Sequence, residues 1–260
     1  MTKVVIQIPC YNEEGTLPRV LADLPKSIDG VGRIETLVVS DGSTDRTVEV
    51  ARGLGVDHVV ELPRNRGLAC AWSAGIEASL KAGADIIVNT DGDNQYCSAD
   101  IEKLVSPILE RRADIVIGAR PIERIDHFSW LKKRLQRLGS WTVSRLAGVH
   151  VEDAASGFRA YSAEAARELN LLSDYSHCTE TLIRAGRRGM SIVNVDVRVN
   201  DKLRDSRLMG SLPGYLVRQV RDVMRASLML HPLKMLGIPA LVLLLVGTAG
   251  CMRFLVYYLG

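Results

Sequence analysis

The sequence predicts an α/β fold in which a mostly parallel, Rossmann-like sheet is flanked by helices. Between residues 4 and 199, short apolar runs alternate with segments of helical periodicity. Strands that alternate with helices in this way form a parallel sheet with crossover connections. Residues 208–230 are amphipathic and residues 236–259 are almost entirely apolar. An amphipathic helix and a transmembrane helix are therefore expected after the sheet domain.

The strands and helices are expected in a regular order. Apolar runs predict strands at Val4–Ile8, Ile34–Val39, Val59–Val60, Ile86–Val88, Ile115–Ile117 and Ile192–Val199. Helical periodicity predicts one helix that begins near Leu17 and a second, after the next strand, that ends near Arg52. Further helices are predicted at Leu68–Lys81, Ala99–Glu110, Ala163–Leu169 and Thr179–Arg188. We expect Ser43 or Thr44 to cap the helix that ends near Arg52.

Polar clusters follow three of the predicted strands. Asn12-Glu13, Asp41 and the pair Asp91 and Asp93 each come directly after an apolar run. Ligands of open parallel sheets bind at the carboxyl ends of the strands, so these clusters should converge at one edge. The first strand is not followed by a Gly-x-Gly-x-x-Gly motif, and the chain has no Walker motif. A dinucleotide-binding or P-loop protein is therefore not supported.

The stretch Asp91-Gly92-Asp93-Asn94-Gln95 contains the candidate metal ligands. In an extended chain, side chains two apart share a face, so Asp91, Asp93 and Gln95 are expected to point in one direction. Two carboxylates and an amide oxygen suit a hard divalent cation that keeps positions open for phosphate oxygens. A plain turn is the alternative, because Asp, Gly and Asn are turn formers. An EF-hand loop is excluded, since Tyr96 stands where that loop requires glycine.

Composition bounds the class of protein. A chain of 260 residues can bury one good core, and its net charge of +3 is too small to imply nucleic-acid binding by itself. The five cysteines are scattered and form no Cys-x-x-Cys pair, which favours a reducing compartment over a disulfide or zinc framework. The first apolar run is short and is followed by two glutamates, so no signal peptide is expected.

The second half of the chain carries membrane signals. Residues 124–145 are basic and amphipathic, which fits either a solvated helix face or a helix at a membrane surface. Residues 236–259 are long enough to cross a bilayer, and Arg253 lies near enough to the end to reach the interface. Lys234 and the arginines before it predict a catalytic domain on the cytoplasmic side of the cell membrane. We expect a catalytic domain at 1–207, an amphipathic juxtamembrane helix at 208–231 and a transmembrane helix at 232–260, which could be the first of a longer membrane region.

An ordered set of motifs resembles glycosyltransferase family 2, and within it the branch that acts on polyprenyl phosphates. The matching segments are Pro9–Glu13, Val39–Asp45, Asn65–Gly67, Asp91–Gln95, Ser156–Arg159 and Arg204–Arg207. The resemblance implies a GT-A fold, an NDP-sugar donor, Mg²⁺ or Mn²⁺, and inverting transfer of one sugar to a polyprenyl (dolichyl or undecaprenyl) phosphate held in membrane lipid. Gly92 departs from the family's commoner Ala, and Arg207 stands where the family usually has Lys.

The resemblance also implies roles for individual residues. The positions implied to bind the nucleotide sugar are Pro9, Tyr11, Asn12, Glu13, Asp41, Arg66, Gly67, Asp91 and Gly92. The implied metal ligands are Asp91, Asp93 and Gln95. The implied contacts to the acceptor phosphate are Ser156, Arg159, Arg204, Ser206 and Arg207. The catalytic candidates are Asp93, Arg120, Asp153 and Glu180, of which Asp153 and Glu180 could act as a base or as an orienting group.

The chemistry of the acceptor decides whether a base is needed. A phosphate monoester has a second pKa near 6 and is already nucleophilic at neutral pH, so a polyprenyl phosphate needs no strong general base. A sugar hydroxyl, the alternative acceptor, would need one, and Glu180 or Asp153 would then be indispensable. A nucleotidyltransferase would need a Gly-rich phosphate loop with Arg or Lys after the first strand, which is missing here. A membrane-tethered nucleotide-binding scaffold is a further alternative. The sequence leaves open whether the donor is a UDP- or GDP-sugar and whether the chain forms a homo-oligomer.

Overall fold

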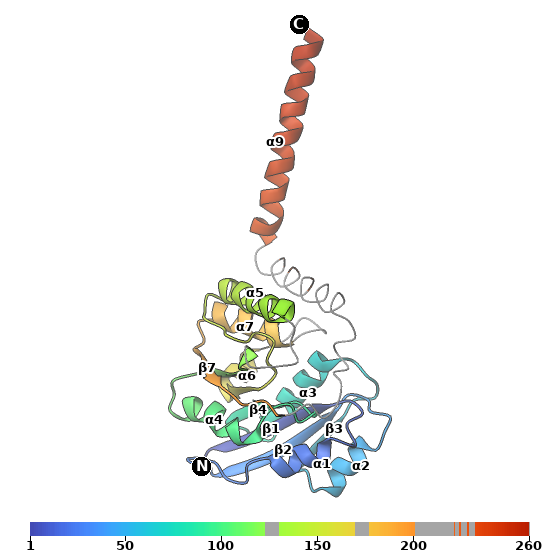
Figure 1. Ribbon diagram of the computed structural model, residues 1–260, viewed down its shortest axis with the longest axis vertical. Coiled ribbons are helices and arrows are strands. Elements are labelled where there is room, and N and C mark those ends of the chain that lie inside the picture. Colours follow the sequence, from blue (N-terminus) through green and yellow to red (C-terminus); the bar gives the residue numbers. More distant parts are fainter. Residues whose placement is uncertain are drawn as a thin grey trace. The chain divides into compact units, whose positions relative to one another are not determined.

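The computed structural model describes residues 1–122, 130–169, 177–200 and 232–259, together with Arg221, Met224 and Leu228 (Figure 1). The chain divides into two compact units, Met1–Tyr215 and Leu216–Gly260. Most of the helix predicted over 208–230 lies outside the described residues, as do Arg204, Ser206 and Arg207.

The first unit is built on a seven-stranded sheet with the order β3-β2-β1-β4-β6-β5-β7. Strand β1 pairs in parallel with β2 and β4, β2 pairs in parallel with β3, and β5 pairs in parallel with β7. The prediction of a mostly parallel sheet is therefore confirmed. The strands are β1 (Lys3–Cys10), β2 (Arg33–Ser40), β3 (His58–Glu61), β4 (Ile86–Asn89), β5 (Ile115–Ala119), β6 (Arg159–Ser162) and β7 (Ile192–Asp196).

Strand β6 was not predicted from the sequence. It inserts antiparallel between β4 and β5, with Arg159 opposite Asn89 and opposite Ile117. Because β6 runs in the opposite direction, its first residue lies at the same edge as the last residues of β1, β2 and β4. The predicted last strand is also shorter than expected. It ends at Asp196, because the chain then leaves β5 and Val199 pairs with Tyr96 instead.

Helices cover both faces of the sheet (Figure 1). On one face, side chains of β1 such as Ile6 pack with helices α1 (Leu17–Asp23), α2 (Thr47–Gly53) and α4 (Ile101–Leu109). On the other, Val5 packs in a cluster with helices α3 (Leu68–Lys81), α6 (Ala163–Glu168) and α7 (His177–Arg187). This division follows from the alternation of side chains along a buried strand. The remaining helices among the described residues are the short 3₁₀ helix η1 (Ser98–Asp100), α5 (Trp130–Ala147) and α9 (Pro232–Leu259).

The cap predicted for α2 was wrong. The helix begins at Thr47, and neither Ser43 nor Thr44 caps it. The carboxylate of Asp45 instead accepts the backbone N–H of Thr47 at 3.0 Å. Ser43 and Thr44 bond with Asn12 in the neighbouring loop.

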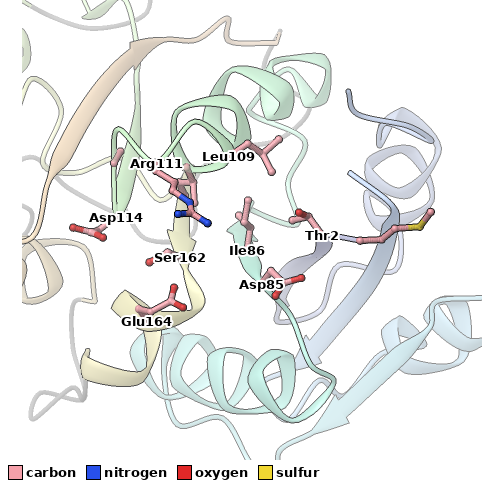
Figure 2. Close-up of a pocket in the computed structure, with 11 residues that line it drawn as sticks. Thr2, Asp85, Ile86, Leu109, Arg111, Asp114, Ser162 and Glu164 are labelled. Atoms are coloured by element: carbon pink, nitrogen blue, oxygen red, sulfur yellow. The ribbon is translucent and has the colours of Figure 1, made fainter. Parts of the chain in front are cut away.

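A pocket of 650 Å³ opens at the amino-terminal edge of the sheet, away from the predicted site. Its lining includes Asp85 and Asp114, which directly precede β4 and β5. Figure 2 shows Asp114, Ser162 and Glu164 on one side of this pocket and Asp85 on the other. The polar clusters that follow β1, β2 and β4 lie at the opposite, carboxyl-terminal edge.

In the second unit, helix α9 contains a stretch, Met235–Leu259, with a mean hydropathy of 2.1. It is the one helix among the described residues that is long and apolar enough to cross a membrane, and no part of it is buried. A helix of 25 residues rises about 37 Å at 1.5 Å per residue, which exceeds the hydrocarbon thickness of a bilayer.

Candidate active site

The loop after β2 is tied to the segment that leads into α3. Both carboxylate oxygens of Asp41 accept backbone N–H groups, from Arg66 and from Gly67, each at 2.8 Å. Gly42 makes this approach possible, because it has a φ of +64° and a Cβ there would lie 2.3 Å from the carbonyl carbon of Arg64. The structure thus brings together Asp41, Arg66 and Gly67, three residues that the sequence assigned to the nucleotide sugar.

The loop after β1 links the first strand to the acidic turn. The hydroxyl oxygen of Thr16 lies 2.7 Å from a carboxylate oxygen of Glu13 and 2.7 Å from the carbonyl oxygen of Gly92. The backbone N–H of Glu13 donates to the hydroxyl of Thr47 at 2.8 Å. Tyr11 is 39% exposed at this edge.

The residues after β4 form a turn, as the alternative to an extended chain predicts. Asn94 has a φ of +57°, and the carboxylate of Asp93 accepts the N–H of Gln95 at 3.1 Å. Gly92 packs on the β1 loop, because a Cβ there would lie 2.9 Å from the sulfur of Cys10. The assumption that Asp91, Asp93 and Gln95 share one face of an extended chain was therefore wrong, since the backbone turns between them.

The electrostatic field at this turn is negative. Burial, followed by the charges of Glu13, Asp45, Asp91 and Asp93, raises the pKa of the Cys10 thiol far above its usual range. Within the described residues, no group of three or more His, Cys, Asp or Glu side chains surrounds one metal position. Two carboxylates in a negative field nevertheless fit a hard divalent cation that takes its other ligands from a diphosphate.

A buried ion pair lies next to the acidic turn. Arg120, which follows β5, donates from Nε and Nη2 to the two carboxylate oxygens of Asp153, at 2.6 and 3.0 Å. The two side chains are only 7% and 1% exposed. Burial opposes the charge of Arg120, but Tyr96, Asp153 and Asp91 raise its pKa above the ordinary value. Asp153 is therefore placed to orient Arg120, and this geometry favours the orienting role over that of a base.

The arginine of the Ser156–Arg159 motif is enclosed by protein. Arg159 is fully buried, and its terminal nitrogens donate to the carbonyls of Cys178 and Ala154 at 2.7 and 2.9 Å. Ser156 is also fully buried, and its hydroxyl accepts the N–H of Phe158. These contacts do not support direct binding of the acceptor phosphate by either residue. They suit a role in holding the motif against α7.

Glu180 lies in the first turn of α7, where its carboxylate accepts the Nε–H of Arg184 at 3.0 Å. The pair is largely buried, with side chains 20% and 13% exposed. The structure therefore gives Glu180 a charged partner on its own helix, and a role as base remains a prediction.

Sequence reasoning missed Tyr96 as a site residue. It is 3% exposed, and its hydroxyl accepts the N–H of Gly157 at 3.2 Å. Gly157 in turn lies against Asp91, because a Cβ on it would be 3.1 Å from a carboxylate oxygen. The available signal was the position of Tyr96 directly after the acidic stretch, where it served only to exclude an EF-hand.

Comparison with known proteins identifies the family of the chain. A profile described as Glycosyl transferase family 2 matches residues 5–169. The chain is 30% identical over 229 residues to the undecaprenyl-phosphate mannosyltransferase of Micrococcus luteus, covering 84% of this chain and 92% of that protein. It is 32% identical over 203 residues to the dolichyl-phosphate hexose transferase of Haloferax volcanii, covering 76% and 83%.

The fold has a solved counterpart. Glucosyl-3-phosphoglycerate synthase from Mycobacterium tuberculosis, in complex with Mn²⁺, uridine diphosphate and phosphoglyceric acid, superposes with a TM-score of 0.66. It is 23% identical, and the superposition covers 88% of this chain and 78% of that one. At this identity the similarity concerns the fold, which is of the GT-A type. With the family profile and the two relatives, it leads to one conclusion: the chain is a member of glycosyltransferase family 2.

Proposed function

We propose that the protein transfers one sugar, with inversion, from an NDP-sugar to a polyprenyl phosphate at the cytoplasmic face of the cell membrane. The observation that carries the proposal is the proximity of opposite charges at one edge of the sheet. Asp91, in the acidic turn, is among the charges that raise the pKa of the buried guanidinium of Arg120, and Asp91 and Asp93 are among those that raise the pKa of Cys10. A cation at the turn and the guanidinium would flank phosphate groups from two sides. The names of the relatives support the acceptor class.

The residues present would share the work as follows. Asp91 and Asp93 would hold Mg²⁺ or Mn²⁺, with the side-chain oxygen of Gln95 as a further ligand. When bound, the ion would neutralise charge on the departing diphosphate. Asp153 fixes Arg120, whose guanidinium has five N–H donors, of which the ion pair uses two. The other donors suit phosphate oxygens.

The bond changes balance without a general base. A phosphate oxygen of the acceptor attacks the anomeric carbon from the face opposite the diphosphate. The bond from that carbon to the diphosphate oxygen breaks, and its electron pair leaves with the nucleoside diphosphate. Because the acceptor is already an anion at neutral pH, neither Glu180 nor Asp153 has to remove a proton. The buried pair of Asp153 with Arg120 is consistent with this assignment.

Helix α5 gives the catalytic unit its own surface for lipid. Trp130 and Trp141 are 65% and 57% exposed, and the guanidinium of Arg134 lies 4.3 Å from the centre of the Trp130 ring. Arg145 lies over Trp141 at 5.7 Å. The helix contains no Asp or Glu. Exposed aromatic rings beside basic side chains suit the interface of an anionic membrane.

The lipid contact has a direct test, because Trp72 is the only other tryptophan and is buried. In the full chain reconstituted into anionic vesicles with brominated acyl chains, we expect the fluorescence of Trp130 and Trp141 to be quenched. The variant Trp130→Phe/Trp141→Phe retains only Trp72 and should escape quenching. Equal quenching of the two proteins would contradict membrane contact through α5.

The activity itself is tested in detergent, with a short polyprenyl phosphate and a panel of UDP- and GDP-sugars. Mass spectrometry of the lipid extract should find one glycosyl-phosphoryl-polyprenol, formed with Mn²⁺ or Mg²⁺ and lost with EDTA. Sugar found on an oligosaccharide instead of the lipid would move the assignment to a hydroxyl acceptor. Tight nucleotide binding with no product would leave a nucleotide-binding scaffold.

A further inference from the structure

Tyr96 lies at the junction between the acidic turn and the Ser156–Arg159 motif. Its ring stacks on that of Phe158, with centroids 4.8 Å apart and planes at 17°. Its backbone pairs with Val199, and its carbonyl accepts the side-chain N–H of Asn200 at 3.0 Å. The residue is thus held on both sides, by the motif and by the segment after β7.

The hydroxyl of Tyr96 completes a chain of contacts that ends at a candidate metal ligand. It accepts the N–H of Gly157 at 3.2 Å, and the carbonyl of Gly157 accepts the side-chain N–H of Asn89 at 2.8 Å. Both polar groups of this peptide segment are therefore engaged. Asp91 lies against the same glycine, at 3.1 Å from the position of a Cβ. The backbone of Gly157 therefore packs against the Asp91 carboxylate, and the Tyr96 hydroxyl fixes that backbone by a hydrogen bond.

The surroundings keep this hydroxyl neutral. Burial raises the pKa of Tyr96 well above its usual range, although the charge of Arg120 and a hydrogen bond with Ser156 lower it and the charges of Asp91 and Asp153 raise it further. A neutral phenol can accept one hydrogen bond and donate another, which suits a fixed contact rather than proton transfer. Tyr96 is also too buried, at 3% exposure, to touch a substrate.

We propose that Tyr96 is a positioning residue that sets the place of the Asp91 carboxylate by holding Gly157. The proposal rests on the proposed function, because it treats Asp91 as a ligand of the donor's divalent cation. Loss of the hydroxyl would leave the buried N–H of Gly157 without its partner, and the Gly157 backbone beside Asp91 would shift. The cation should then bind less tightly, although no ligand has been changed.

The test compares Tyr96→Phe with Tyr161→Phe in the full chain. Tyr161 is the matched control, because it is also a buried tyrosine and it packs edge-on against Trp72. Binding of Mn²⁺ in the presence of UDP is measured by electron paramagnetic resonance of free Mn²⁺. We expect Tyr96→Phe to weaken Mn²⁺ binding about tenfold and Tyr161→Phe to change it less than about twofold.

A second variant changes Gly157 itself. Gly157→Ala would place a methyl group 3.1 Å from the Asp91 carboxylate and should also weaken Mn²⁺ binding, even if Tyr96→Phe does not fold. If the wild-type protein transfers sugar and both variants bind Mn²⁺ normally, the positioning role alone is overturned. A wild-type protein that neither binds Mn²⁺ with UDP nor transfers sugar would overturn the proposed function and this inference with it.

Discussion

The two halves of the candidate site hold their carboxylates by different kinds of donor. At the ends of β1 and β2, the carboxylates are held by neutral donors: Asp41 by two backbone N–H groups, and Asp45 by the N–H and hydroxyl of Thr47. Beside β5, the charge of Asp153 is matched by the guanidinium of Arg120. Neutral donors leave a carboxylate its full charge, whereas an ion pair cancels it.

This difference explains where a ligand's charges would go. The first half, together with the acidic turn, keeps a negative field that a bound cation would complete. In the second half, the charge of Asp153 is balanced by Arg120 within the protein. Substitutions in the first half should therefore act mainly on activity and ligand binding, whereas those of the Arg120–Asp153 pair should lower stability as well as activity.

The largest expected effect is on activity. Asp93→Asn removes one of the two carboxylates of the acidic turn, and we expect transfer to fall at least a thousandfold, about 4 kcal/mol in the barrier. The free energy of unfolding should change little, because the Asn side chain can still accept the N–H of Gln95. Asp29→Asn, at an exposed position, is the matched control for transfer and unfolding. A stable Asp93→Asn protein with normal turnover would refute the metal assignment.

The next effect is on stability. Arg120→Leu leaves the charge of Asp153 buried and without its cation, which should lower the free energy of unfolding by about 3 kcal/mol. We place it at the lower end of the usual range because Asp153 also accepts the N–H of Ala155. Urea unfolding in detergent provides the measurement.

The exposed pair of Arg112 with Glu110 supplies the contrast for that experiment. Arg112→Leu should cost less than about 1 kcal/mol, because water screens an exposed pair. Arg120→Leu/Asp153→Leu should recover part of the lost stability but no transfer activity. Equal losses for Arg112→Leu and Arg120→Leu would show that the second half does not depend on its buried pair.

The sequence predicts the first half better than the second for a physical reason. Buried parallel strands are predictable because their residues form continuous apolar runs. Ligands bind at the carboxyl ends of such strands, so Glu13, Asp41 and Asp91 are expected to lie together. Strand β6 has only four residues, and one of them is Arg159. Such a segment has neither the length nor the apolar character of a predictable strand.

Contacts between distant segments are also invisible in the sequence. Arg120 and Asp153 are separated by 33 positions, and Tyr96 meets Gly157 across 61. Local patterns do not report such pairs. The turn at Asn94 shows a third limit: a single residue with positive φ overturns the alternation assumed for an extended chain.

The pH dependence of the free energy of unfolding also distinguishes the two halves, with a smaller expected effect. Burial, helped by the nearby charge of Arg159, lowers the pKa of His177 from 6.5 to about 3. The unfolded chain therefore binds a proton between about pH 6.5 and 3 that the folded chain does not, so stability falls as the pH drops through this window. From pH 7 to 5 the loss should be about 2 kcal/mol.

The variant His177→Phe tests this assignment, because a phenyl ring can keep the stack on Trp72 but does not titrate. Its free energy of unfolding should lack the loss between pH 7 and 5. In the first half, hydrogen bonds from Thr47 lower the pKa of Asp45 despite its burial, so its stabilising effect is lost only in more acidic solution. An unchanged slope in His177→Phe would assign the pH dependence to other groups.

The smallest expected effect comes from Asp41→Asn. An Asn oxygen can accept one of the two N–H groups of Arg66 and Gly67, but the amide nitrogen would face the other donor. We expect a loss of about 1 kcal/mol in the free energy of unfolding, because one buried donor loses its partner. If the loop also binds the nucleotide, the KM for the donor should rise while kcat stays within about twofold, since the change is remote from the reacting atoms. A fall in kcat at constant KM would instead show that Asp41 stabilises the transition state. The loop and the acidic turn would then not differ in their effect on catalysis.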